Sequence, residues 1–239
     1  MAGYVQKSSP ASFGGGTTAA PSITGVAANS LLVAIATWFQ GAANASPPTI
    51  GSGWSTAVNP SGNTAAADAG YSEGVTMFYL ESASAGTHNP TITLPNAGYG
   101  EVEIREFSGA ALTSALRAVA SNVVSTTAST LSSGTTNGTP QTGDIVVVAV
   151  AGGARTFTDF TIDNPPTGYS NGSIQASSNV TCPSEVASAI AGSGGAKSAS
   201  WAISPATSYT GAIAVFAAAG GGGAAAPVFL NHLRTQGIA

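Results

Sequence analysis

Two short runs of apolar residues constrain the fold of this chain most strongly. Residues 31–36 read LLVAIA and residues 145–150 read IVVVAV, so neither run alternates between apolar and polar positions. Successive side chains of a β-strand point to opposite faces of its sheet. A strand that is apolar at every position must therefore be covered on both faces. We expect each run to form the central strand of a sheet.

Other segments have the residue types that favour strands, and turn-forming clusters separate them. Rich in β-branched and aromatic residues are 75–80, 91–94, 101–107, 116–124, 198–203 and 211–216. Clusters of Asn, Pro, Asp and Gly, such as 44–48 and 163–168, supply the backbone angles of chain reversals. No ten-residue window of the body has an apolar stripe at helical spacing. The sequence predicts an all-β fold, an antiparallel β-sandwich of the jelly-roll or immunoglobulin-like kind.

The order of these elements repeats along the chain. The first half reads NSLLVAIA, GSGW, MFYLESASAG, PTITL and EVEIREFSG, and the second reads GDIVVVAV, PTGY, VASAIAGSG, SASWAI and GAIAVFAAAG. Ile145 follows Leu31 by 114 residues, and Phe216 follows Phe107 by 109. A duplicated motif explains this spacing. We expect a body over 1–219 with pseudo-repeat halves at about 1–112 and 113–219, either as two tandem sandwiches or, as we favour, as one compact unit.

Charge and composition disfavour several classes of partner. Only 7% of the residues are charged, the formal net charge is −4, and the chain has six Lys and Arg residues. This is too little positive charge to follow a nucleic-acid backbone, so no nucleic-acid partner is expected. The first nine residues become polar too early for a signal peptide. The apolar window 212–230 is interrupted by four glycines, so no membrane span is expected either.

The residues that bind metals or form disulfides are scarce. Cys182 is the only cysteine, so the chain can form no internal disulfide. With His88 and His232 as the only histidines, a zinc site of His and Cys ligands cannot be completed. Asp144, Asp159 and Asp163 could bind calcium in a loop, but we expect solvated turn acids. We predict no cofactor.

The composition changes after residue 219. Residues 220–226 are Gly and Ala, which predicts a flexible linker. In 227–239, Pro227 suits a first helical position, Gly237 suits the position after the helix, and the apolar side chains predict a short amphipathic helix. This peptide could fold back on its own sandwich or fray, but we favour docking on another subunit. The predicted partner-binding residues are Pro227, Phe229, Leu230, Leu233 and Ile238.

One formal catalytic pattern is present. Residues 168–172 read GYSNG, and Glu185 and His232 follow Ser170 in the serine, acid, histidine order of one hydrolase class. That motif works on a sharp turn from strand to helix, and no helix is expected after Ser170. We interpret residues 171–172 as a hairpin turn and expect no enzyme.

Alternation along 101–107 separates the charged residues of that strand. Glu101, Glu103 and Arg105 fall on one face, and Glu106 falls on the other face with Val102 and Ile104. We therefore expect a single glutamate, Glu106, to point inward. A buried carboxylate needs partners, so Glu106 should cap backbone amides or pair with an arginine.

Two aromatic residues occupy corresponding places in the two halves. Trp54 ends GSGW and Tyr169 ends PTGY. Flat rings with polar edges bind sugars, so both are candidate glycan contacts, although a repeated packing element is the simpler interpretation. Trp38 and Trp201 lie inside apolar strands and should fill the core.

The motif order over about residues 20–220, a buried LLVAIA or IVVVAV strand, a GSGW or PTGY turn, an AG hairpin and a closing EFSG strand, resembles β-sandwich proteins of tailed-phage structural modules and some bacterial genomes. The resemblance implies a non-enzymatic virion accessory protein, a capsid decoration or tail component. It would assemble in the host cytoplasm, form a homo-oligomer and bind other virion proteins. A carbohydrate-binding or host-recognition module is the alternative.

Overall fold

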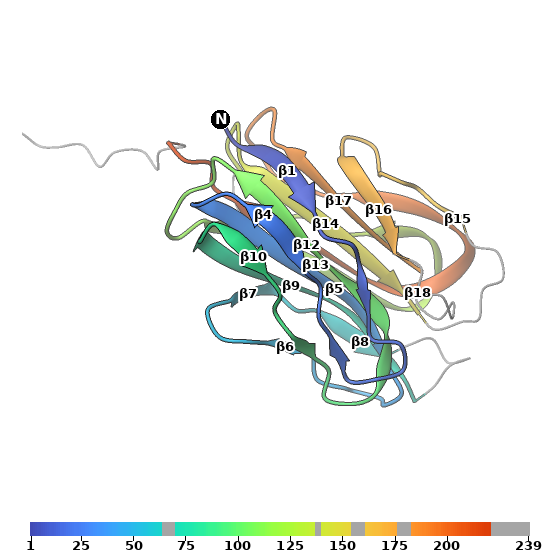
Figure 1. Ribbon diagram of the computed structural model, residues 1–239. Helices are drawn as coiled ribbons and strands as arrows, with labels where there is room; N and C mark the ends of the chain where they lie inside the picture. The colour runs from blue at the N-terminus through green and yellow to red at the C-terminus, as the bar shows by residue number, and fades with distance from the viewer. Residues whose placement is uncertain (64–69, 137–139, 154–160, 176–182, 221–239) are drawn as a thin grey trace, which may run out of the picture.

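The computed structural model describes residues 1–63, 70–136, 140–153, 161–175 and 183–220. These residues form antiparallel strands and contain no helix (Figure 1). The all-β prediction is confirmed, and the arrangement agrees with a β-sandwich. Figure 1 shows the first half of the chain, blue to green, packed against the second half, yellow to red.

The first half builds a seven-stranded sheet. Its strand order is β1 (Gly3–Lys7), β12 (Gly98–Ser108), β5 (Ser30–Gln40), β9 (Ser72–Ala83) and β7 (Ser55–Val58), with β2 (Ala11–Ser12) beside β12 and β8 (Ser61–Asn63) beside β9. The strand β5 contains the first apolar run and lies at the centre of this order, as its sequence predicted.

The second half builds a six-stranded sheet with a matching order. Its strands are β13 (Leu116–Ser132), β18 (Ser200–Phe216), β14 (Ile145–Gly152), β17 (Ser184–Ile190) and β16 (Ser170–Gln175), with β15 (Thr161–Ile162) beside β18. The registers correspond as well: Phe107 lies opposite Leu31 in the first sheet, and Phe216 lies opposite Ile145 in the second.

The two sheets pack face to face over a central core to which both halves contribute. Val33 and Ile35 of β5 and Met77 of β9 belong to the same buried cluster as Val147 of β14 and Ala214 of β18. All five side chains are fully buried. Burying each large apolar side chain contributes roughly 1.5–3 kcal/mol. This core is therefore the main source of cohesion between the halves.

Each sheet also has a second core on its outer face. Behind the first sheet, Trp38, Phe78 and Ile104 are covered by two small sheets. These are β4 (Ile23–Val26) with β10 (Gly86–His88), and β3 (Thr18–Ala19) with β11 (Ile92–Thr93) and β6 (Thr49–Ile50). Behind the second sheet, Trp201 and Ile213 belong to that sheet's outer core. Every residue of β5 and β14 is buried, which confirms that both apolar runs are covered on both faces.

The outer core of the second sheet exists because two long strands curl over it. The sequence predicted separate strands at 198–203 and 211–216, whereas β18 is one strand of 17 residues. Its first part pairs with the end of β13, with Trp201 opposite Leu131, and its last part pairs with β14. Gly211 allows the curl, because a Cβ there would lie 2.1 Å from the carbonyl oxygen of Ser132.

Candidate functional site

A network of buried polar groups joins the two sheets along one side of the central core. Arg105 of β12 forms a 2.5 Å ion pair from Nε to Oε1 of Glu103. Its guanidinium also crosses to β17, donating to the carbonyl oxygen of Val186 at 2.8 Å and to Oγ of Ser188 at 3.3 Å. The two charged side chains have no exposed surface. Arg105 therefore ties the first half to the second.

Lys7 of β1 extends this network to the next strand. Its Nζ lies 3.5 Å from Oε2 of Glu103 and donates a 2.6 Å hydrogen bond to Oγ of Ser173 on β16. Deeper in the interface, the hydroxyls of Thr37 and Ser184 are 3.0 Å apart. Strands β1, β5 and β12 of the first half are thus bonded to strands β16 and β17 of the second half.

The burial of Glu103 and Arg105 corrects the expectation that a single glutamate on β12 points inward. The alternation along the strand is as predicted, but the second sheet covers the face that carries Glu103 and Arg105. The missed signal was the pair of opposite charges two positions apart, since such a pair shares one face and can neutralise itself when that face is buried.

Glu106, on the other face of β12, has the role that the sequence predicted. Its carboxylate accepts hydrogen bonds from the backbone N–H of Ala27 at 2.9 Å, the hydroxyl of Ser30 at 2.7 Å and Nε2 of Gln6 at 2.6 Å. Burial by itself would raise the pKa of Glu106, but these three hydrogen bonds outweigh it and the pKa is lowered. The backbone-capping prediction is confirmed.

Other acids fix the chain near the junction of the halves. Glu81 accepts from the backbone N–H groups of Ser114 at 3.1 Å and Ala115 at 2.5 Å. Asp144 lies 2.9 Å from Nε of Arg117 and accepts from the backbone N–H of Ala218 at 3.2 Å. Asp144 has no exposed surface, so the expectation of a solvated turn acid was wrong for it.

Of the remaining calcium candidates, the structure describes Asp163 alone. Asp163 accepts a 2.9 Å hydrogen bond from the backbone N–H of Ala202, and Asp159 lies outside the described residues. Within the ranges that the structure describes, no group of three or more His, Cys, Asp or Glu side chains could hold a metal ion.

The described residues of the hydrolase-like pattern make other contacts. Oγ of Ser170 donates to the carbonyl oxygen of Ser188 at 3.3 Å, and residues 170–175 form strand β16. Oε2 of Glu185 accepts a 2.6 Å hydrogen bond from Nε1 of Trp201, and burial raises the pKa of Glu185 to about 7. His232 lies outside the described residues.

The two candidate glycan contacts lie far apart in the fold. Trp54 packs against the core behind the first sheet, and Tyr169 packs against the core behind the second sheet. Both sheets separate these cores, so the structure does not bring the two rings into one platform. Trp38 and Trp201 are fully buried, as predicted.

Tyr169 lines a surface pocket of about 220 Å³. Thr167, Ile190, Lys197 and Ser198 are among its other lining residues. The hydroxyl of Tyr169 donates to the carbonyl oxygen of Ser198 at 2.9 Å, and burial raises its pKa to about 12. In the part of the chain that the structure describes, Lys197 is the one Lys or Arg without an ion pair to a carboxylate.

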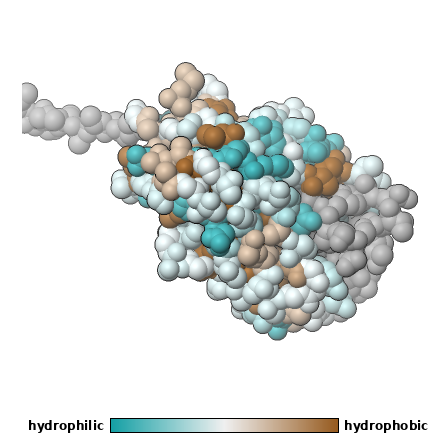
Figure 2. Space-filling view, in the orientation of Figure 1, coloured by the Kyte–Doolittle hydropathy of each residue, from teal (hydrophilic) through white to brown (hydrophobic). Residues whose placement is uncertain are grey.

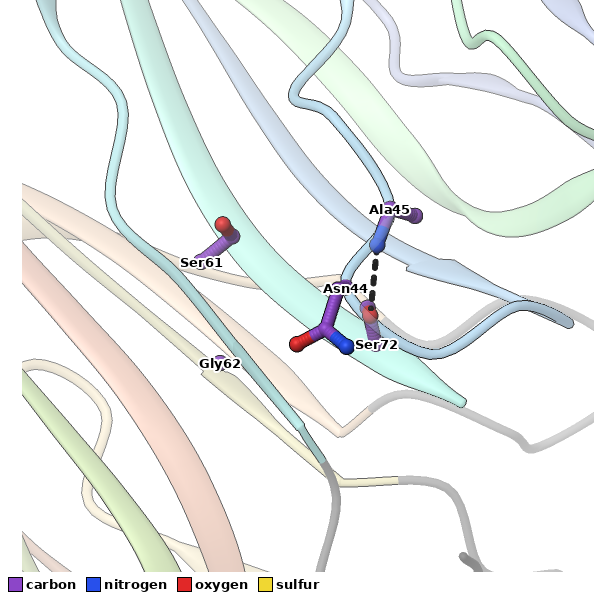
Figure 3. A pocket seen from close by; sticks show the side chains of 5 residues that line it. All are labelled: Asn44, Ala45, Ser61, Gly62 and Ser72. Atoms are coloured by element: carbon purple, nitrogen blue, oxygen red, sulfur yellow. Dashed lines mark hydrogen bonds between the residues drawn. The ribbon is translucent and has the colours of Figure 1, made fainter. Parts of the chain in front are cut away.

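A second pocket, of about 190 Å³, is lined by small polar residues (Figure 3). They are Asn44, Ala45, Ser61, Gly62 and Ser72. The backbone N–H of Ala45 donates to Oγ of Ser72 at 3.0 Å, the bond drawn in Figure 3. None of these five described lining residues has an acidic or basic side chain, so they offer hydrogen-bonding groups alone.

Comparison with protein-family profiles, with characterised proteins and with solved structures found no match to this chain. Among the described residues, no helix has the length and apolarity needed to cross a membrane. The predicted partner-binding residues Pro227, Phe229, Leu230, Leu233 and Ile238 lie outside the described residues.

Proposed function

We propose that this chain is a non-enzymatic structural protein of a tailed-phage virion, a capsid decoration or tail component that binds other virion proteins. The observation that carries the proposal is the use of the buried charges. Arg105 pairs with Glu103 and bonds across to the second sheet, and Asp144 and Glu106 accept hydrogen bonds from backbone amides. Charged groups are few in this chain, and these four form bonds inside the fold.

The surface supports a role in assembly. Figure 2 shows a face that is mostly of intermediate hydropathy, with small separate patches of hydrophilic and hydrophobic residues. Such a surface has little charge to repel copies of the same protein at high local concentration. The motif order of the sequence, which resembles virion accessory proteins, gives the proposal its biological setting.

The C-terminal arm would supply the contact with other virion proteins. The described body ends beside the junction of the halves, where the N–H of Ala219 donates to the carbonyl oxygen of Gly109 at 2.7 Å. Residues 221–226 could span up to about 20 Å when extended, and an arm that docks on a neighbour adds contacts at little extra association cost.

Removal of the arm tests this role. Deleting residues 221–239 should abolish incorporation into particles, measured by immunoblotting of purified virions. A full-length variant with Phe229→Ser, Leu230→Ser and Leu233→Ser is the matched control for chain length, and it should also fail to incorporate. Normal incorporation of both variants would contradict docking by the arm.

The pocket at Tyr169 favours a second candidate, a carbohydrate-binding or host-recognition module. Its lining residues supply the ring of Tyr169, the hydroxyls of Thr167 and Ser198 and the ammonium of Lys197, which are groups that bind sugars. On a glycan array, Tyr169→Ala should abolish binding, whereas Trp54→Ala, in the corresponding place of the first half, should keep it. Absence of glycan binding by the unaltered protein would reject this candidate.

A further inference from the structure

One edge of the second sheet is open to another strand. Among the described residues, β13 pairs with β18 alone. Residues 118–124 run in unbroken register along it, from Ala118 opposite Val215 to Val124 opposite Tyr209. An edge strand has unpaired backbone N–H and C=O groups on its outer side, and an added strand can bond to them.

The corresponding edge of the first sheet is interrupted. There the chain forms the short strands β1 and β2, which are separated by Pro10 and followed by a turn in which Gly14 and Gly15 have positive φ. The register of β1 also shifts between Tyr4 and Gln6. Short strands, proline and bulges are the usual protection of a sheet edge. The strand β13 contains neither Pro nor Gly in its 17 residues, and its own register shifts lie on either side of residues 118–124.

Charge, the other common protection, is also missing from β13. Its single charged residue is Arg117, which lies 2.9 Å from the buried Asp144. Residues 118–132 carry no charge, and the side chain of Val123 is 42% exposed. An uncharged edge can approach an identical edge without repulsion. The edge is therefore suited to a copy of itself.

We propose that β13 pairs antiparallel with β13 of a second copy of this chain, centred on Ser121. Such a contact is two-fold symmetric and self-complementary. In this register Val119 lies opposite the partner's Val123, which is a favourable β-branched pair. Arg117 lies opposite the partner's Ser125, so like charges do not meet. The two six-stranded sheets become one continuous sheet.

The interface does not depend on the virion role, because purified protein should form it without other components. Sedimentation velocity of the full chain at tens of micromolar should show a dimer. Because Ser121 faces its own copy at the centre, Ser121→Lys and Ser121→Glu should each weaken the dimer by about tenfold or more. Mixing the two variants should restore it as a heterodimer, which also shows that both are folded.

Ser129→Lys is the matched control, because Ser129 is an exposed residue of the same strand outside the paired stretch. It should leave the dimer unchanged. A monomeric unaltered protein, an oligomer that neither Ser121 variant weakens, or a mixture that stays monomeric would each overturn the self-pairing. A variant that still forms the dimer but is not incorporated into virions would instead indicate a defect in docking by the arm.

Discussion

Nε1 of Trp201 donates a 2.6 Å hydrogen bond to Oε2 of Glu185, a carboxylate with no exposed surface. The first half has the corresponding bond, 3.1 Å from Nε1 of Trp38 to Oγ1 of Thr76. Thr76 lies opposite Ala36 in the first sheet, and Glu185 lies opposite Val150 in the second, so the two acceptors occupy matching positions. One half satisfies its tryptophan with a neutral hydroxyl and the other with an ionisable acid.

This difference predicts a pH-dependent stability that originates in the second half. Burial raises the pKa of Glu185 from 4.5 to about 7. Its stabilising contribution is therefore complete below pH 4.5 and is lost as the pH rises to about 7, by roughly 3 kcal/mol. Glu185→Gln should remove this slope, so that it is more stable than the unaltered protein at pH 8 and no more stable at pH 4.5.

Urea unfolding at a series of pH values measures the effect. Thr76→Val is the control in the first half, because it removes the matching acceptor without adding or removing a titratable group. Its destabilisation should not vary between pH 5 and 8. An equal stability difference between Glu185→Gln and the unaltered protein at every pH would contradict the role of Glu185.

Glu106 should show the opposite pH dependence. Its pKa is lowered, so its contribution is complete above the unfolded value of 4.5 and declines as the pH falls through the folded value. Glu106→Ala leaves the N–H of Ala27 and the hydroxyl of Ser30 without their acceptor, and should cost about 2–3 kcal/mol at pH 7. Thermal unfolding should show this cost shrinking at acid pH, and a cost that grows there would refute it.

The Arg105 network predicts an asymmetry between single and double substitutions. Arg105→Ala leaves Glu103 buried without its closest cationic partner and should destabilise the protein by about 3–5 kcal/mol. Arg105→Met combined with Glu103→Met removes both charges and keeps the volume, so its cost should be far smaller. Chemical denaturation followed by tryptophan fluorescence compares them. Equal costs would contradict the prediction that the loss comes mainly from a buried, unpaired Glu103 carboxylate.

The close approach of Gly211 to β13 predicts a steric effect. A Cβ at Gly211 would lie 2.1 Å from the carbonyl oxygen of Ser132, so Gly211→Ala must displace the backbone and should cost more than 2 kcal/mol. Gly192→Ala is the control, because a Cβ there meets no atom within 4 Å. Calorimetry should give a lower melting temperature for Gly211→Ala alone.

The strands that the sequence predicted are those whose own side chains specify them. Residues 31–36 and 145–150 are apolar throughout, and both are central strands. The strand β17 was not among the predicted strands, because its sequence SEVASAI has no aromatic residue and consists mostly of small residues, and the first sheet covers it through contacts such as those of Arg105 with Val186 and Ser188. The two predicted segments of β18 join because pairing with β13 continues on either side of the polar residues between them.

A polar residue, too, could be predicted where residues close to it in the sequence determine its surroundings. The capping role of Glu106 could be predicted because Val102 and Ile104 share its face of the strand. The burial of Arg105 could not be predicted, because it depends on a second sheet that includes Val186 and Ser188, which lie 81 and 83 positions later in the chain. Long-range packing of this kind leaves no local periodicity in the sequence.

The assignment to a virion can be measured directly. Phage particles purified from cells that express this chain should contain it at a fixed copy number by quantitative mass spectrometry, and electron cryomicroscopy should place its two stacked sheets at a repeated position on the capsid or tail. Its absence from infectious particles in a lysate that contains the protein would contradict the structural role.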